Sequence, residues 1–436
     1  MKNFRFCTVL LLLLAAAAVV IFTSCETMGG QAGGGASGEG AFPAGSPEDV
    51  AFQRLQKSGK DGGVGLSVAA SGDGSVWLRS SPYTLLPGGK DFIGMAALFE
   101  SGKEKASALF FDENSANLLF GASCALSPDG SLAVFGAPET SPGGTGYIFG
   151  YLRHPDGSYP LWFRIPAQGK GWLWGMDVDV SGGGGKTVVI GAPGEDGHGR
   201  VHYFLAPEGG WPEADDSNIR KGYLGAGGAQ PGDEFGRSVA VSKDDSTIIV
   251  GSPGKNGGQG IVYLFTKPAE GWLQTRDLVP LDLADAQGDR FGQSVAVSGD
   301  GSVIAAGAPG AADGAGGVYI ITIPKDGGEP KFVFFPAEND RGMGISVDVS
   351  ADGKTVAAGG YGREYSGTLK VYRSESGNWD DSKQIADWFG DPAKPEQKGA
   401  MLGYSFELVD DGSKLFGGIP FYKDGGGTAM WFNIEE

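Results

Sequence analysis

The sequence predicts an all-β protein, a seven-bladed β-propeller with four-stranded antiparallel blades, and three observations support this. A unit of about 56 residues recurs seven times along the chain. Each unit contains short apolar runs bounded by Gly, Asp, Ser or Pro, which is the pattern of short strands joined by tight turns. Each complete unit has room for four such runs, as a propeller blade requires.

The two clearest copies of the unit begin at Phe235 and Phe291. Each opens with Phe-Gly-x-Ser-Val-Ala-Val-Ser and turns into a second apolar run that ends at Pro253 or Pro309. A third run follows a glycine, and a more polar fourth run closes the unit, as in residues 271–278. The glycine that opens each unit, called here the anchor glycine, recurs at Gly65, Gly121, Gly175, Gly236, Gly292, Gly344 and Gly403.

The last unit is one strand short, because the chain ends soon after Phe432. Residues 49–58 include an apolar segment, Val50–Gln56, that precedes the first unit and has no place in it. An unpaired edge strand is a liability that closed folds remove. We therefore predict that this segment forms the outer strand of the last blade and closes the ring.

Residues 1–24 have the composition of a secretory signal. Lys2 and Arg5 precede an uncharged apolar run over residues 9–22, which is too short for a comfortable membrane span. The run ends in Phe-Thr-Ser-Cys25, which resembles the lipobox of bacterial lipoproteins, with Phe22 where that family usually has Leu. The resemblance implies cleavage before Cys25, acylation of its thiol with palmitate-like chains and of its new amine, and anchoring in the bacterial cell envelope, at the outer membrane or cell surface. The alternative is a plain secretory signal with an incidental cysteine.

Residues 25–48 are rich in Gly, Ala and Ser and contain almost no large apolar side chains. Such a segment cannot bury enough surface to fold, so we predict a flexible tether. The predicted organisation is a signal peptide over 1–24, the tether over 25–48 and one propeller over 49–436. Cys124 is then the only unmodified cysteine of the mature chain, and its apolar strand position predicts a buried thiol.

The charge of the chain excludes one class of partner. The net charge is −18, and residues 1–24 carry two basic and no acidic residues, so the mature chain is near −20. Such a chain repels nucleic acid and anionic lipid surfaces. We expect no nucleic-acid partner, and we expect membrane contact through the lipid anchor alone.

Residues 235–253 and 291–309 resemble FG-GAP repeats, the units of the integrin α-chain head. Phe120-Gly121 and the Gly-Ala-Pro corners at Pro138 and Pro193 agree with this resemblance, which covers about residues 60–436. It implies a seven-bladed propeller used for binding, commonly in adhesion or protein contact. Many members carry a calcium loop between the first two strands, but here that connection shrinks to Asp-Gly-Ser turns with too few carboxylates for calcium. No metal and no cofactor is predicted.

Acidic residues occur in the strand expected nearest the axis. The position four residues after the anchor glycine is Ala in four units, but it is Asp179, Asp348 and Glu407 in the others. A buried unpaired charge is costly, so each carboxylate should contact water, a cation or a hydrogen-bond donor. Our hypothesis is an axial polar site of Asp177, Asp179, Asp348 and Glu407. The alternative is local hydrogen bonding to backbone amides at the rim of the channel.

The tryptophans divide into two groups. Trp172 and Trp174 stand beside the third anchor glycine in a connection expected on one face, where exposed aromatic rings suit a sugar or a protein partner. Packing between blades is the alternative for this pair. We expect that packing role for three tryptophans that recur at one turn position, Trp211, Trp272 and Trp379.

Sequence motifs for catalysis are missing. The chain has three histidines, and it contains no G-x-S-x-G, HExxH or CxxC motif. Residues 182–187 resemble the end of a phosphate-binding loop, but the required first glycine falls at Val180 and no helix signal follows, so we predict a turn. We predict a non-enzymatic binding module for a protein or a glycan. The alternatives are a carbohydrate-binding or enzymatic propeller that uses the axial carboxylates and face tryptophans, and a structural subunit of an envelope assembly.

Overall fold

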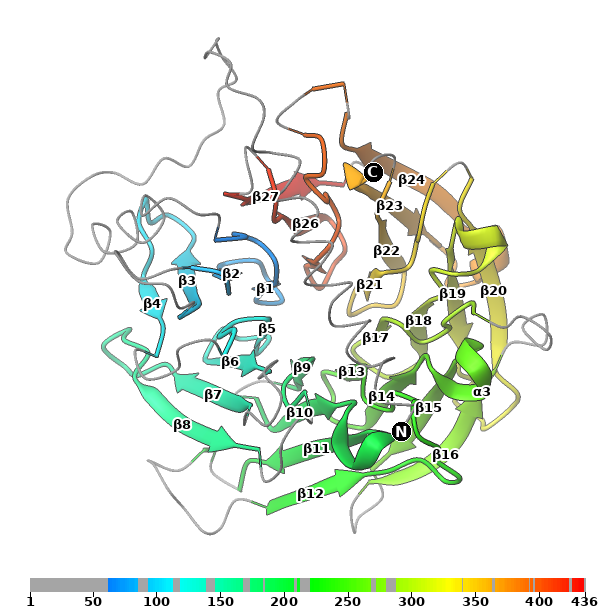
Figure 1. The fold of residues 1–436 in the computed structure, drawn as a ribbon, viewed down its shortest axis with the longest axis horizontal. Helices are drawn as coiled ribbons and strands as arrows, with labels where there is room; N and C mark the ends of the chain where they lie inside the picture. The colour runs from blue at the N-terminus through cyan, green and yellow to red at the C-terminus, as the bar shows by residue number, and fades with distance from the viewer. Residues whose placement is uncertain are drawn as a thin grey trace, which may run out of the picture.

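The computed structural model describes most of the chain after Asp61. The described residues are 62–84, 93–112, 118–138, 146–167, 173–182, 185–207, 210–211, 220–267, 272–279, 288–338, 340–362, 365–391, 393–394, 397–422 and 426–434. They form seven antiparallel sheets, each of consecutive strands, placed around a common axis (Figure 1). The predicted seven-bladed propeller is confirmed.

The first three blades have four strands each. Blade 1 contains β1 (Val68–Ala70), β2 (Val76–Ser81), β3 (Met95–Glu100) and β4 (Ala108–Phe110). Blade 2 contains β5 (Ser123–Leu126), β6 (Leu132–Ala137), β7 (Tyr147–Leu152) and β8 (Leu161–Pro166). Blade 3 contains β9 (Val178–Val180), β10 (Thr187–Ala192), the 3₁₀ turn η1 (Glu195–Gly197), β11 (Arg200–Leu205) and β12 (Arg220–Leu224).

The other four blades repeat this plan, with three strands described in the last. Blade 4 contains β13 (Ser238–Val241), β14 (Thr247–Ser252), the short helix α3 (Lys255–Gly258), β15 (Ile261–Thr266) and β16 (Leu273–Leu278). Blade 5 contains β17 (Val295–Val297), β18 (Val303–Gly307), η3 (Ala312–Gly314), β19 (Gly317–Thr322) and β20 (Lys331–Pro336). Blade 6 contains β21 (Ser346–Val349), β22 (Thr355–Gly360), β23 (Thr368–Arg373), η5 (Trp379–Asp381) and β24 (Lys383–Phe389). Blade 7 contains β25 (Phe406–Leu408), β26 (Lys414–Ile419) and β27 (Thr428–Asn433).

The anchor glycines explain the spacing of the repeat. All seven have φ between 79° and 91°, a conformation that glycine adopts without the steric cost of a side chain. At Gly344 a Cβ atom would lie 2.4 Å from the carbonyl oxygen of Gly317 in the preceding blade. Glycine is therefore required here both by the backbone angle and by the close approach of two blades.

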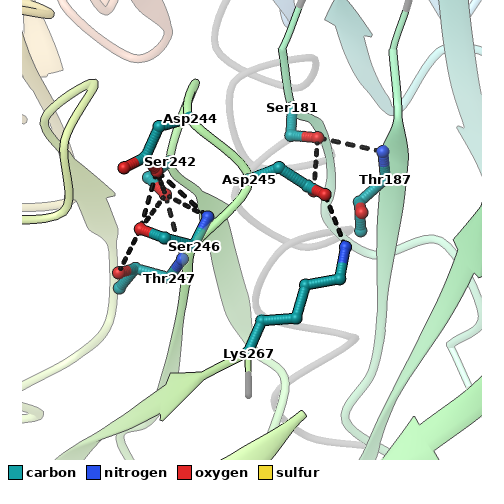
Figure 2. A network of polar contacts seen from close by, with 8 residues as sticks. All are labelled: Ser181, Thr187, Ser242, Asp244, Asp245, Ser246, Thr247 and Lys267. Carbon is teal, nitrogen blue, oxygen red and sulfur yellow. Dashed lines mark hydrogen bonds and ion pairs between the residues drawn. The ribbon is translucent and has the colours of Figure 1, made fainter. Parts of the chain in front are cut away.

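The first hairpin of a blade is held by a serine and an aspartate. In blade 4 the Ser242 hydroxyl donates to Asp244 Oδ1 (2.6 Å), which also accepts from the Ser246 amide (3.0 Å), as Figure 2 shows. The Ser242 oxygen accepts from the Thr247 amide at the start of β14 (3.0 Å). The same serine–aspartate bond recurs in blades 1, 2, 5 and 6, at Asp73, Asp129, Asp300 and Asp352. The Asp-Gly carboxylates thus stabilise turns.

Blade 3 obtains the missing carboxylate from its neighbour. Its first hairpin contains glycines in place of the aspartate, and the Ser181 hydroxyl donates instead to Asp245 Oδ1 of blade 4 (2.8 Å). Asp245 also binds Lys267 Nζ, and the two hairpins are therefore joined (Figure 2). Strand β10 begins at Thr187. The glycine-rich segment that resembles a phosphate loop is therefore followed by a strand and not by a helix, in agreement with the predicted turn.

The blades are joined by backbone bridges and by shared cores. Parallel bridges link Gly260 to Phe291 and Gly316 to Met343, and the same type of bridge links Val64 of the first blade to Gly427 of the last. The hydrophobic clusters contain residues of two neighbouring blades. The recurring tryptophans are buried in these clusters, as predicted: Trp211, Trp272 and Trp379.

Several predictions fall outside the described residues. These are the signal peptide, Cys25, the tether and the closing strand over residues 49–58. Within the described part of the chain, no helix has the length and apolar character needed to cross a membrane. Cys124 is buried as predicted, and burial raises the pKa of its thiol to about 12.

Candidate functional site

A ring of side chains joins the innermost strands of the seven blades. The residue two positions after each anchor glycine bonds to the backbone of the next blade. Ser67 Oγ accepts from the Cys124 amide (3.0 Å), and Ser123 Oγ donates to the Gly175 carbonyl (2.9 Å). The ring is continued by Asp177, Ser238, Ser294, Ser346 and Ser405, the last of which accepts from the Val68 amide of blade 1. These positions therefore stabilise the ring.

Three of the four predicted axial acids bridge two blades. Asp179 accepts from the amide of Val180 in its own strand (2.7 Å) and from the amide of Val241 in blade 4 (2.7 Å). Corresponding pairs of bonds are made by Asp177, to Val178 and Val239, and by Asp348, to Val349 and Leu408. Each of the three carboxylates thus joins neighbouring blades through backbone amides, as the alternative interpretation describes.

Glu407 occupies in blade 7 the position of Asp179 and Asp348, and its carboxylate makes no hydrogen bond to another described residue. Its carboxylate lies within electrostatic reach of Asp348 and Asp179, so the acids do gather around the axis. Burial raises the pKa of Asp177 to about 6 and that of Asp179 to about 7. Burial likewise raises the pKa of Glu407 well above its ordinary value, and the charge of Asp348 adds to this effect.

An ion pair lies across the axis near these acids. Lys243, in the first hairpin of blade 4, pairs with Asp410, in the first hairpin of blade 7. The positive charge of Lys243 opposes the rise in the pKa of Glu407 and of Asp348. The chain therefore supplies its own cation to the axial acids, and no group of three or more His, Cys, Asp or Glu side chains with metal-binding geometry occurs among the described residues.

Of the two predicted face aromatics, the structure describes Trp174, which does not lie open on the face. Trp174 is 4% exposed, and its ring packs edge-on against His202 (4.4 Å between centroids), so the alternative of packing inside the fold holds for it. Trp172 lies outside the described residues. His202 Nε2 is 2.6 Å from the buried Glu195 carboxylate, which also lies 3.6 Å from Arg200 Nε. The contacts in this part of blade 3 therefore do not indicate a binding site for a sugar or for a metal ion.

The structure contains a cavity that sequence reasoning missed. Its volume is about 480 Å³, and it lies between blade 6 and the connection that enters blade 6 from blade 5. Its charged and aromatic lining consists of Glu338, Asp340, Lys370, Asp387, Phe389 and Asp391. Lys370 Nζ is 2.8 Å from Asp340 Oδ2 and 3.9 Å from Asp387 Oδ2.

One signal in the sequence could have found this cavity. The third strand carries an aromatic residue at the position equivalent to Lys370 in blades 2, 4 and 5, at Phe149, Tyr263 and Tyr319. Blade 3 has His202 at this position, paired with the buried Glu195, and blade 6 has the lysine. A buried charged residue in such a column is a departure that needs a buried partner. The partners Asp340 and Asp387 come from a connection and from the next strand, which no motif brings together.

Comparison with known proteins supports the fold and the repeat. The FG-GAP repeat model matches residues 221–265 and 272–321, within blades 3 to 5. A comparison with curated proteins found no match. The chain thus carries FG-GAP repeats in a seven-bladed propeller.

Solved structures of several unrelated functions share the architecture. Hydrazine synthase of Kuenenia stuttgartiensis has a TM-score of 0.56 at 14% identity, over 86% of this chain and 97% of that one. The β-propeller domain of Cps50 (Swd1) from Myceliophteria thermophila has a TM-score of 0.52 at 9% identity, over 85% and 96%. The periplasmic gluconolactonase PpgL of Pseudomonas aeruginosa reaches 0.46 at 16% identity, over 74% and 84%. At these identities the similarity is one of fold, and fold does not give function.

Proposed function

We propose that this propeller with FG-GAP repeats is a non-enzymatic binding module, held at the bacterial cell envelope by a lipid on Cys25. The observation that carries the proposal is the use of the axial carboxylates. Asp177, Asp179 and Asp348 each accept amide bonds from two blades, so the residues that an axial active site would need already hold the ring together. The repeat type favours contact with a protein or a glycan.

The anchoring part of the proposal rests on the sequence before the propeller. The lipobox-like residues Phe22–Cys25 follow a basic start and an apolar run, and a glycine-rich segment of about 20 residues would give the propeller reach from the bilayer. Two or more acyl chains give stable anchoring, whereas a single chain gives marginal binding.

The enzymatic alternative has less support. His202 is paired with Glu195, and a carboxylate–imidazole pair of this kind can act as a general base. The contacts of this pair that the structure describes are to Trp174 and Arg200, and neither of these side chains is a nucleophile. The observed arrangement is therefore one that stabilises the loop after β10.

The anchoring is tested by growing cells with an alkyne-bearing palmitate and isolating the full chain. We expect label and membrane association for the wild type and their loss in Cys25→Ala. Cys124→Ala is the matched control, because it removes a buried thiol and should keep the label. Label retained by Cys25→Ala, or a soluble wild type, would contradict the anchor.

The binding role is tested by crosslinking in intact cells, with the wild type as bait and Cys25→Ala as control. A defined protein partner captured only by the anchored chain would support a tethered protein-binding module. A glycan array with the purified full chain covers the second ligand class. Turnover of a lactone or glycoside substrate by the pure chain, abolished in Glu195→Gln, would contradict the non-enzymatic proposal.

A further inference from the structure

The cavity of blade 6 lies where blade 5 has a stack of aromatic rings. Gly307 pairs with Val318 in blade 5, and the corresponding Gly359 pairs with Leu369 in blade 6. One residue further along the third strand, Tyr319 of blade 5 is therefore equivalent to Lys370 of blade 6. The residues opposite them on the fourth strand are Phe334 and Asp387.

The two equivalent pairs fill space differently. In blade 5 the rings of Tyr319 and Phe334 stack with centroids 4.3 Å apart, and Phe291 packs against Tyr319 at 5.2 Å. In blade 6 a lysine and an aspartate replace the stacked rings, and the cavity of about 480 Å³ opens beside them. Its volume lies within the range of about 300–1,000 Å³ that is common for ligand pockets.

The lining of the cavity includes a polar atom with unused hydrogen-bonding capacity. Asp340 Oδ2 is buried and makes no hydrogen bond to a described residue, although Lys370 Nζ lies 2.8 Å away, and the buried Thr368 lines the cavity beside this pair. A buried acceptor without a hydrogen bond is unfavourable, so a donor group of a ligand or a water molecule inside the cavity would satisfy it.

The walls carry more negative than positive charge. Four carboxylates and one lysine line the cavity, and the lysine contacts Asp340 and Asp387. Glu338 is exposed, and among the described residues Asp391 Oδ1 accepts from one backbone amide, that of Ala393 (2.9 Å). Phe389 stands beside these groups with 71% of its surface exposed.

We propose that this cavity binds a ligand with an ammonium or guanidinium group on an aliphatic stem. The carboxylates of Glu338 and Asp391 can accept from such a group, and the Thr368 hydroxyl can bond to it further inside. The face of Phe389 suits both the stem and the cation. The inference rests on the proposed binding function but does not depend on the lipid anchor.

The lining disfavours other classes of ligand. An anion would meet an excess of carboxylates. A divalent metal ion would compete with the Lys370 ammonium, which already lies between two of the four carboxylates. The cationic group can come from a free polyamine or from a lysine or arginine side chain of a protein partner, because both present the same chemistry.

The test measures binding to the full chain in detergent by calorimetry. The probes are spermidine, a capped Gly-Gly-Lys-Gly-Gly peptide, the same peptide with Nε-acetyl-lysine, and maltose as a neutral sugar. We expect saturable 1:1 binding of spermidine, of the lysine peptide, or of both, and none of the acetylated peptide. The probe that binds tells a small polyamine from a protein side chain.

Variants place the binding in the cavity. Glu338→Gln with Asp391→Asn removes the two charges assigned to the ligand at constant shape, and we expect affinity to fall roughly tenfold or more. Glu375→Gln, an exposed acid elsewhere on blade 6, is the matched control and should bind as the wild type does. Phe389→Ala should also weaken binding, and its high exposure means that the fold should tolerate the change.

Three results would overturn the inference. Equal affinity in the charge-removing double variant and in Glu375→Gln would mean diffuse attraction by the acidic chain. Binding of maltose that is lost in Phe389→Ala would make the cavity a sugar site and leave the binding function standing. If no probe binds while the anchored chain still captures a partner, the cavity inference fails and the proposed function stands. If no probe binds and no partner is captured, the cavity inference and the proposed function both fail.

Discussion

Blades 5 and 6 are neighbours with the same strand order, but they use the same positions for different purposes. Blade 5 follows the repeat: Phe291, which bridges to Gly260 of blade 4, packs against the ring of Tyr319, and Tyr319 stacks on Phe334. Blade 6 has Met343, Lys370 and Asp387 at the equivalent positions, an ion pair in place of a stack, and a cavity. Stability and ligand binding make opposite demands on one position, so the unusual members of a repeat are the places to look for function.

The largest difference should appear when the aromatic core of blade 5 is removed. Phe291→Ala deletes a fully buried ring that contacts Tyr319, and we expect a loss of about 3–5 kcal/mol in the free energy of unfolding. Phe389→Ala, which removes an exposed ring of blade 6, should cost no more than about 0.5 kcal/mol. Denaturant unfolding monitored by fluorescence measures both. Equal losses would mean that blade 6 packs as blade 5 does.

The next effect concerns the ion pair of blade 6. Lys370→Ala leaves the carboxylate of Asp340, its partner at 2.8 Å, without its cation, and we expect a loss of about 3 kcal/mol. A triple variant, Lys370→Tyr with Asp387→Phe and Asp340→Gly, gives blade 6 the residues that blade 5 has at Tyr319, Phe334 and Gly288. We expect the triple variant to recover most of the lost stability in the same unfolding assay and to lose the cationic ligand. A triple variant less stable than Lys370→Ala would show that the two blades are not interchangeable.

The dependence of stability on pH separates the axial acids from the hairpin acids. Burial raises the folded-state pKa of Asp177 and Asp179 to about 6 and 7, above their ordinary values. Their contribution is complete below the ordinary pKa near 4 and is lost as pH rises through 6 to 7. Hydrogen bonds from Ser75 and Ser413 lower the pKa of Asp73 and Asp411, so the hairpins lose stability as pH falls below about 4.

The melting temperature should therefore be higher at pH 5 than at pH 8. Asp179→Asn cannot ionise, so we expect it to reduce this difference in a thermal scan at the two pH values. Asp73→Asn is the control, because it should leave the difference between pH 5 and pH 8 unchanged. A wild type that is more stable at pH 8 would contradict the burial of the axial acids.

The smallest effect belongs to the borrowed carboxylate between blades 3 and 4. Asp245→Asn keeps an acceptor for the Ser181 hydroxyl and removes the charge that binds Lys267, and we expect a loss of about 0.5–1 kcal/mol. Lys267→Met should cost about the same, and the double variant should cost little more than either, because both remove one interaction. Strictly additive losses in denaturant unfolding would show that the pair is not coupled.

The sequence predicts the architecture because its signals are local and repeated. The Ser-x-Asp-Gly turn and the positive-φ glycine, as at Ser298–Gly301 and Gly236, each specify one hairpin or one corner regardless of the rest of the chain. Seven copies then leave few folds other than a closed ring. The position of the axial acids near the axis follows from the same alignment.

The partners of those acids could not be predicted in the same way. Asp179 bonds to the Val241 amide of the next blade, and that contact depends on how two sheets are placed around the axis. Trp174 is buried because its own blade supplies His202 to pack against it, which residue spacing does not show. The cavity of blade 6 combines a connection, a third strand and a fourth strand, so only the assembled blade brings its lining together.

The bridge between Val64 and Gly427 has a mechanical consequence. The first described strand of the ring is reached through this seam, where the Val64 amide donates to the Gly426 carbonyl (3.3 Å) and Gly65 donates to Ser80 (2.8 Å). Tension applied at Gly62 would therefore load the junction between the first and last blades before it loads the sheet of blade 1. Under such a force the ring should open at this seam.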